Sequence, residues 1–339
     1  MPPRRYRGIL FGAGNVARTA HLPGFLATPE LRDRLEIVAA VDARPNLPSL
    51  DGLPILTRGD EALQLGGIDF VDICTPTSSH LELALWALDQ GLHVLCEKPV
   101  ALSRREADLL GSRARAARRV VMPCHQYRWN PAWRKVREWL EGGRIGRWHL
   151  AEFRTYRPHA DPGAGSGPVA WRGLGAASRG GVLLDHGTHL LYLLRDVAGP
   201  PSAVHAWSGR LRHRAYDVED TAQLLLEYPD RLATLFLTWA GRGRETTIRF
   251  LGERGVIEWV GGDLKLDSDD GAEALDYREQ LLKTSYPGWF AGLFRDFVEA
   301  MDRGSLEAPL ADVAAVASVL EQAYEAGARS RGEEMPRSA

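Results

Sequence analysis

The first side chain that could take part in chemistry is Lys98, in the stretch Glu97-Lys98-Pro99 directly after an apolar run over residues 92–95. That run predicts a buried strand, so Lys98 is expected where the strand ends and the chain turns. Pro99 keeps the preceding residue out of helical geometry, and the ammonium is therefore held on a short extended corner. Ligands of open α/β sheets bind beyond the carboxyl ends of the strands, which would place Lys98 at the mouth of a cofactor site. A solvated lysine paired with Glu97 is the competing interpretation.

The second candidate is the stretch Asp185-His186-Gly187-Thr188-His189. If residues 183–194 are helical, Asp185 and His189 share one face, and the carboxylate can orient the imidazole and raise its basicity for acid/base catalysis. A surface pair at a helix start would have the same spacing. A divalent metal held by Asp185, His186 and His189 is a third interpretation. It is disfavoured because a helix turns His186 about 100° away from that face and no fourth ligand is evident.

A glycine-rich turn near the N-terminus has the context of a dinucleotide-binding motif. The apolar run Tyr6–Phe11 predicts a strand, and it leads through Gly12-Ala13-Gly14-Asn15-Val16-Ala17 into a helical stretch. Gly12 permits the tight turn and Gly14 lets the backbone approach a pyrophosphate. Ala17 is small enough for close packing of the helix on the strand. This turn therefore predicts a nucleotide-binding βα unit.

Asp42 follows the next apolar run, Leu35–Val41, where a carboxylate can accept hydrogen bonds from the adenosine ribose. A carboxylate there repels a 2′-phosphate, so NAD is the expected cofactor. Arg44 could soften this preference, which leaves NADP compatible with the sequence. The spacing from Gly12 to Asp42 exceeds the usual figure of about twenty residues. An additional segment over residues 22–34 accounts for the excess.

Composition sets the class of protein. The chain has 339 residues, 45% of them hydrophobic and 25% charged, and a formal net charge of −2, which fits an ordinary globular protein with two domains. This charge favours no nucleic-acid partner. The apolar run after the basic N-terminus is too short for a signal or membrane segment, so a cytoplasmic protein without a membrane partner is expected. Cys74, Cys96 and Cys124 stand apart, as in a reducing compartment.

The first half of the chain alternates strands with helices, which predicts an N-terminal Rossmann domain, a doubly wound parallel sheet over residues 1–125. The further strands are expected over residues 68–74, 92–95 and 120–124, and Ser78 or Ser79 should cap a helix over residues 81–90. After His125 a helix over residues 130–140 precedes a series of strand-like runs. These predict a C-terminal α+β domain over residues 126–330 with a large, mainly antiparallel open sheet, followed by a tail at 331–339. The expected strands are Trp148–Tyr156, residues 202–210, Thr221–Tyr228, and residues 232–239, 246–251 and 256–260. Amphipathic helices are expected over residues 290–301 and 311–327.

Residues 158–181 form a long glycine-rich connection that contains Trp171-Arg172. A loop of this length within a compact domain favours a lid or binding loop over a linker. Trp129, Trp133 and Trp171 lie near this loop and the domain boundary. They could pack on sugar C–H surfaces or belong to the core, where tryptophan is mostly buried.

Taken in order, these residues resemble the glucose-fructose oxidoreductase and inositol dehydrogenase family (Gfo/Idh/MocA) over nearly the whole chain. The matching stretches are Gly12 to Ala17, Thr75-Pro76-Thr77 with His80, Glu97-Lys98-Pro99, Arg128 with Asn130-Pro131, Trp171-Arg172, and Asp185 with His189.

The resemblance implies that Lys98, Asp185 and His189 carry the catalysis. The cofactor-binding residues would be Gly12, Gly14, Asn15, Val16, Asp42, Thr75, Pro76, Thr77, His80, Glu97 and Lys98. The substrate-binding residues would be Lys98, Arg128, Trp171, Arg172, Asp185 and His189. A position that is usually acidic in the family is Tyr192 here.

The expected function is an NAD(P)-dependent oxidoreductase acting on a secondary hydroxyl or ketone of a sugar, cyclitol or related polyol. A dinucleotide-binding sensor of the same fold is the alternative, but a sensor has no need of the three catalytic residues together. A homodimer or homotetramer is expected as well, because residues 232–239 are apolar at nearly every position and both faces of that strand need cover.

Overall fold

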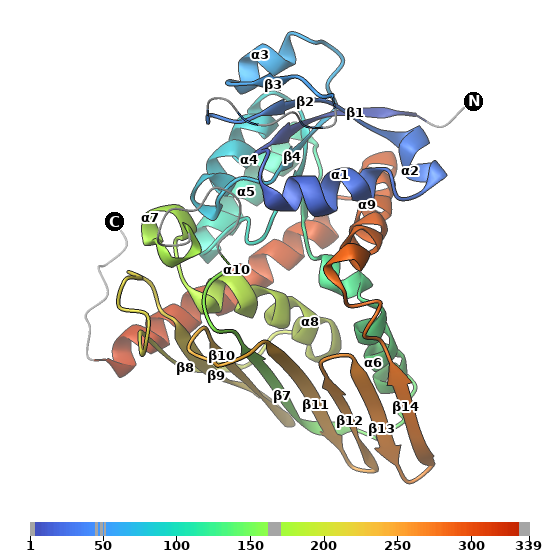
Figure 1. Cartoon of the computed structure of the whole chain (residues 1–339), viewed down its shortest axis with the longest axis vertical. Helices are drawn as coiled ribbons and strands as arrows, with labels where there is room; N and C mark the ends of the chain where they lie inside the picture. The colour runs from blue at the N-terminus through green and yellow to red at the C-terminus, as the bar shows by residue number, and fades with distance from the viewer. Residues whose placement is uncertain (1–3, 45–46, 48–49, 51, 162–170, 332–339) are drawn as a thin grey trace. The chain divides into compact units, whose positions relative to one another are not determined.

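The structure, a computed structural model, describes residues 4–44, 47, 50, 52–161 and 171–331 (Figure 1). Residues 162–170 of the glycine-rich connection and the tail from residue 332 lie outside the described residues. The chain divides into two compact units. One consists of Met1–Trp129 with Lys283–Ala317, and the other of Asn130–Leu282 with Ser318–Ala339. Within the described residues every helix is too short or too polar to cross a membrane.

The first unit contains the predicted doubly wound parallel sheet. Its six strands lie in the order β3-β2-β1-β4-β5-β6 and every neighbouring pair is parallel. Chain connections run in opposite directions from β1, which makes the carboxyl ends of β1 and β4 the switch point where such sheets bind ligands. The strands are β1 (Tyr6–Phe11), β2 (Leu35–Val41), β3 (Ile55–Leu56), β4 (Phe70–Ile73), β5 (His93–Cys96) and β6 (Val121–Pro123).

Helices cover both faces of this sheet, because successive strand residues point to opposite sides. Leu10 belongs to the core beneath α1 (Leu22–Phe25) and α9 (Tyr286–Arg303), whereas Ile9 belongs to the core beneath α4 (His80–Asp89) and α5 (Arg104–Ala117) (Figure 1). The other helical elements are η1 (Ala17–His21), α2 (Pro29–Arg34), α3 (Gly59–Leu63), η2 (Thr77–Ser79) and η3 (Gln126–Trp129).

The second unit contains an eight-stranded sheet in the order β14-β13-β12-β11-β7-β10-β9-β8. It is antiparallel except where β10 pairs with β7, which confirms the predicted sheet type. The strands are β7 (Trp148–Tyr156), β8 (Ala203–Gly209), β9 (Thr221–Tyr228), β10 (Arg231–Thr238), β11 (Glu245–Gly252), β12 (Gly255–Val260), β13 (Asp263–Ser268) and β14 (Gly271–Asp276).

The helix α6 (Pro131–Glu141) packs on one face of this sheet. Asn130 caps it by accepting hydrogen bonds from the backbone N–H groups of two residues in the first turn. Trp133 of α6 is completely buried against Phe153 and Phe250, so it belongs to the core. The remaining helical elements are η4 (Trp171–Gly173), α7 (Gly175–Ser178), η5 (Leu183–Gly187), α8 (Thr188–Ala198), η6 (Lys283–Ser285) and α10 (Glu307–Ser330).

The structure differs from the sequence-based expectations in three respects. The strands β13 and β14 were not predicted, since charged residues interrupt their apolar pattern. The helix α9 follows the second sheet in the chain but packs in the first unit, where Phe294 stacks on Phe25 with ring centres 4.1 Å apart. Ser79 occupies the N-cap of α4 without a side-chain capping bond, and its hydroxyl lies instead within hydrogen-bond distance of Pro76 O and Thr75 Oγ1.

Candidate functional site

The glycine turn after β1 has the geometry that its residues predict. Gly12 has φ +89°, and its N–H donates to Val41 O at 2.8 Å. A Cβ at Gly12 would come within 2.8 Å of the Cys74 backbone, so a larger residue cannot fit. A Cβ at Gly14 would meet no atom within 4 Å, which leaves bare backbone beside the exposed Asn15 and the half-buried Val16. This turn fits the approach of a pyrophosphate.

Asp42 follows β2 and its carboxylate already accepts four hydrogen bonds. Ala13 N donates to Oδ2 at 2.9 Å, and Arg44 donates from its backbone N, its Nε and its Nη2 at 3.0, 2.9 and 2.7 Å. Burial raises the pKa of Asp42, but these donors and the Arg44 charge outweigh it, so that the pKa lies below its ordinary value. Asp42 is therefore an ionised acceptor, and a ribose would have to share it with Arg44.

The loops after β4 and β5 are tied together by His80. Its Nδ1 lies 2.9 Å from Pro99 O and its Nε2 lies 2.9 Å from Thr75 O. The imidazole is buried, and burial lowers its pKa despite the two carbonyls. His80 thus connects two of the predicted cofactor-binding stretches, while Thr77 is buried and Pro76 is exposed beside it.

Lys98 is half-buried directly after β5, at the carboxyl edge of the first sheet as predicted. Its peptide bond to Pro99 is cis. The backbone N–H of Lys98 donates to Oε2 of Glu97 at 3.2 Å. The Glu97 side chain therefore holds the backbone of the residue that carries the ammonium.

A buried ionic cluster that sequence reasoning missed lies next to Glu97. His21, the last residue of η1, has its Nδ1 3.0 and 2.9 Å from the two carboxylate oxygens of Asp72. Its Nε2 is 3.1 Å from Glu97 Oε1. Burial lowers the pKa of His21, but the two carboxylates outweigh it and raise the pKa to about 9. Burial raises the pKa of Glu97, but the hydrogen bond and charge of His21, together with the charges of Lys98 and His80, lower it overall.

The same cluster contains potential metal ligands. Among the described residues, two groups have ligand atoms within 4.8 Å of one another: His21, Asp72 and Cys74, and His21, Glu97 and Cys124. Both ring nitrogens of His21 already contact carboxylates, and burial raises the pKa of both thiols well above its ordinary value. Neutral thiols and a protonated imidazole are poor metal ligands, so the cluster fits an ion-pair chain.

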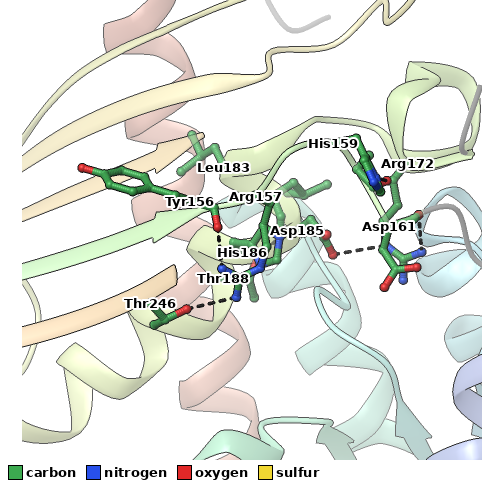
Figure 2. A network of polar contacts seen from close by, with 12 residues as sticks. Tyr156, Arg157, His159, Asp161, Arg172, Leu183, Asp185, His186, Thr188 and Thr246 are labelled. Carbon is green, nitrogen blue, oxygen red and sulfur yellow. Dashed lines mark hydrogen bonds and ion pairs between the residues drawn. The ribbon is translucent and has the colours of Figure 1, made fainter. Parts of the chain in front are cut away.

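In the second unit Asp185 lies in η5, a single π-helical turn before α8. Its Oδ1 is 3.4 Å from Arg172 Nε, and its Oδ2 is 3.6 Å from His186 Nε2 (Figure 2). The Arg172 guanidinium lies 4.3 Å from the centre of the Trp171 ring. These contacts bring together the predicted residues Trp171, Arg172 and Asp185. Single π-turns inside helices occur often at functional sites.

His189, in the first turn of α8, is buried with its Nδ1 2.8 Å from the hydroxyl of Tyr192. Tyr192 is fully buried. A neutral imidazole can accept a proton at Nε2 only if Nδ1 carries the hydrogen and donates it, here to Tyr192. Tyr192 thus supplies an orienting contact for His189 that the spacing of Asp185 and His189 did not predict.

The start of η5 is held by residues distant in sequence. The Glu219 carboxylate accepts from Gly181 N at 2.9 Å, from Leu183 N at 3.1 Å and from the Tyr324 hydroxyl at 2.9 Å. A Cβ at Gly181 would lie 1.9 Å from Glu219 O. The glycine is therefore required for this close approach. Nearby, Arg157 joins the ends of β7 and β11 by donating to Tyr156 O, Glu245 O and Thr246 Oγ1 (Figure 2).

Arg128 and Trp129 lie in the first unit. Arg128 forms an ion pair with Asp312 of α10, and the Trp129 indole donates to Asp296 at 3.2 Å. Both side chains thus have partners within their own unit. A role of Arg128 in substrate binding stays a prediction.

Two family models match the chain. Residues 7–125 match "Oxidoreductase family, NAD-binding Rossmann fold", and residues 133–258 match "GFO/IDH/MocA C-terminal domain".

Curated relatives and solved structures are similar to the chain. Levoglucosan dehydrogenase of Pseudarthrobacter phenanthrenivorans is 35% identical over 142 residues, which cover 41% of this chain and 35% of the relative. D-glucoside 3-dehydrogenase of Escherichia coli is 29% identical over 201 residues, 58% of this chain and 55% of the relative. The chain thus matches about a third and about half of their lengths. An oxidoreductase from Agrobacterium radiobacter, solved with NAD+, L-tartaric acid and magnesium, superposes with a TM-score of 0.83 at 23% identity, covering 96% of this chain and 97% of that one. At this identity the superposition shows the shared fold.

Proposed function

Because the chain belongs to the Gfo/Idh/MocA oxidoreductase family, we propose that it transfers a hydride between NAD and a secondary hydroxyl or ketone of a sugar, cyclitol or related polyol. The observation that carries the proposal is the carboxyl edge of the first sheet. There a bare Gly14 backbone, an ionised Asp42 and Lys98 follow β1, β2 and β5. Two relatives that act on sugars, levoglucosan and D-glucosides, support the substrate class.

The residues present fit the cofactor. The Gly12 to Val16 turn would hold the pyrophosphate, and Asp42 would bind the adenosine ribose. Thr75, Pro76 and Thr77, with His80 behind them, and the Glu97-Lys98 corner would line its path along the sheet edge. When bound, NAD supplies the hydride acceptor. NAD is the proposed cofactor. The positive charge of Arg44 would also allow NADP to bind, because it can offset the charge of the 2′-phosphate.

Lys98, Asp185 and His189 form the proposed catalytic set. His189 accepts the hydroxyl proton at Nε2, with its Nδ1 hydrogen directed to Tyr192. Lys98 donates a hydrogen bond to the same substrate oxygen and stabilises the negative charge that develops there. Asp185, held by Arg172, favours the protonated imidazole by its charge. Arg128, Trp171 and Arg172 would contact the rest of the substrate.

The proposal extends to assembly and location. Along β10, Ala233, Leu235 and Leu237 are buried, while Leu232 on the other face is 41% exposed. A homodimer or homotetramer formed through this second face would bury it, and the second unit would then serve both substrate binding and assembly. Light scattering that gave a monomer mass at micromolar concentration would contradict this.

All three cysteines are unpaired and buried, which supports a cytoplasmic protein.

The activity is tested by mixing the protein with NAD and a panel of neutral sugars and polyols, beginning with levoglucosan and methyl glucosides. Reduced nicotinamide should appear with at least one of them, and the Lys98→Ala variant serves as the blank. Cofactor binding is followed in parallel by fluorescence. NAD binding without turnover of any panel member would favour a sensor over an enzyme.

A further inference from the structure

The ionic cluster around His21 takes no part in the proton and hydride steps above, yet it ends one residue from Lys98. Ionised carboxylates only accept hydrogen bonds, and both ring nitrogens of His21 face carboxylate oxygens of Asp72 and Glu97. The pKa of His21, which these carboxylates raise to about 9, puts hydrogen on both nitrogens at neutral pH. His21 is an imidazolium enclosed in the protein.

Within the described residues, the charged groups that face His21 are these two carboxylates, and its other neighbours are neutral. Asp72 comes from β4 and Glu97 follows β5, and both are buried. The thiols of Cys74 and Cys124 also face the ring, and burial keeps them neutral by raising their pKa. From α9 the rings of Phe290 and Phe294 lie 4.4 and 5.7 Å away. This apolar side excludes water that could otherwise screen the carboxylates.

The two oxygens of Glu97 connect this cluster to the catalytic lysine. Oε1 contacts His21 Nε2 at 3.1 Å, and Oε2 accepts the backbone N–H of Lys98 at 3.2 Å. We propose that His21 is a positioning residue for Lys98: its imidazolium keeps Glu97 ionised and oriented, and Glu97 fixes the backbone from which the ammonium reaches the substrate oxygen. This rests on the proposed function of Lys98.

The physical consequence concerns the protonation of Glu97. Without the imidazolium, the buried carboxylates that contact its two ring nitrogens lose the cation between them, which favours protonation of Glu97. A protonated Glu97 is a weaker acceptor for the Lys98 N–H. His80 would still hold the carbonyl of Pro99, so the corner would loosen mainly on the side of Lys98. The pKa of about 9 for His21 agrees with a charge that persists at neutral pH.

The decisive variant is His21→Gln, matched by His93→Gln. His93 is also in the first unit, at the opposite end of β5 from Glu97, and accepts a hydrogen bond from Val120 N at 3.0 Å. Both changes replace a buried or half-buried imidazole by a neutral amide, but only His21→Gln removes a ring that contacts two carboxylates. The readout is NMR of protein labelled at the lysine Cε and Nζ, which is simple because the lysines are Lys98, Lys135, Lys265 and Lys283.

In His21→Gln the Lys98 signals should shift and broaden, whereas His93→Gln should leave them unchanged. With a sugar of the panel that the unmodified protein oxidises, kcat of His21→Gln should be about tenfold lower or more, and this loss should grow as the pH falls. The KM for NAD should stay within about twofold of its value in the unmodified protein. The double variant His21→Gln with Asp72→Asn removes one carboxylate together with the cation. It should therefore recover part of the Lys98 signal position and of kcat, which a merely structural role would not do.

Lys98 signals that are the same in His21→Gln and in the unmodified protein would overturn the proposal. Should His21→Gln not fold, nitrogen-labelled histidine in the unmodified chain decides instead, because a neutral His21 ring at pH 7.5 contradicts it. If the unmodified protein oxidises no panel member, the proposed function fails. The lysine and histidine spectra would still report whether His21 controls Lys98.

Discussion

The two π-helical turns, η1 in the first unit and η5 in the second, use the same backbone device for different ends. Each lies directly before an α-helix and each carries a histidine, His21 in η1 and His186 in η5. His21 is completely buried between two carboxylates. The side chains of Asp185 and His186 are 18% and 22% exposed, and Asp185 contacts Arg172 at 3.4 Å. The charged groups around His21 in the first turn are all paired inside the protein, whereas those of the second turn are partly exposed.

This difference indicates how to separate positioning residues from reacting ones. A buried ion whose hydrogen-bonding groups are all engaged can act only through its partners, because no substrate atom can replace them without a large desolvation cost. A partly exposed ion with a longer contact can exchange that contact for a substrate. By this criterion we infer that His21 and Asp72 support the proposed site, and we expect the partly exposed Asp185 and Lys98 to contact the substrate.

The largest effect that tests the comparison is the loss of the reacting groups. Replacing Lys98 or His189 by Ala should lower kcat by roughly a hundredfold or more and leave NAD affinity almost intact, since each acts on developing charge or on the moving proton. Steady-state kinetics and fluorescence measure the two quantities. Lys135→Ala and His205→Ala are matched controls, because each residue forms an ion pair with an exposed glutamate at the surface. Unchanged kcat in both the Lys98 and the His189 variants would remove the mechanism.

The next effect concerns the ionic cluster around His21 and the pH dependence of the free energy of unfolding. The folded-state pKa of His21 is raised from 6.5 to about 9, so its stabilisation is complete below pH 6.5 and is lost as the pH rises through 9. The free energy of unfolding should therefore fall by about 2 kcal/mol between pH 7 and pH 9. Urea denaturation at both pH values measures it. His93, whose pKa is lowered to about 4, stays neutral over this range. A slope that persists in His21→Gln would assign the effect to other groups.

A smaller effect is expected from the groups that orient His189 and tune its charge. Tyr192→Phe removes the hydroxyl that accepts the Nδ1 hydrogen, and Asp185→Ala removes a nearby negative charge. Each should lower kcat by about tenfold and displace the pH optimum, because the basicity of the imidazole changes while His189 and Lys98 remain. The pH profile of kcat is the measurement. A profile that is lower but unshifted would indicate misfolding of α8 instead.

The sequence predicted what local patterns encode. Gly12, Gly14 and Asp42 lie beside apolar runs, and Lys98 is marked by the proline after it, so their positions at the sheet edge followed from neighbouring residues. His21 has no such signal, because its partners Asp72 and Glu97 are 51 and 76 residues away. The same limit applies to Glu219 and Tyr324 around η5. The return of α9 to the first unit depends on Phe290 and Phe294 packing beneath distant strands, which periodicity within the helix cannot reveal.

The smallest expected effect tests whether the contacts of Asp42 are fixed, like those of the His21 cluster, or can be exchanged for a ligand, as proposed for Asp185. Its carboxylate is filled by donors, but one of them, the Arg44 side chain, is 46% exposed and can move. Arg44→Ala should free both oxygens for the ribose hydroxyls and remove the cation nearest to a 2′-phosphate. The preference for NAD over NADP should then rise about fivefold, since an ion pair with one exposed partner contributes roughly 1 kcal/mol. Titration with both cofactors measures the ratio, and Arg58→Ala, which removes an exposed arginine paired with Asp60, is the control. Tighter binding of NADP than NAD by the unmodified protein would mean that Arg44, and not Asp42, determines the cofactor preference. The Asp42 carboxylate would then keep its protein contacts, as the carboxylates around His21 do.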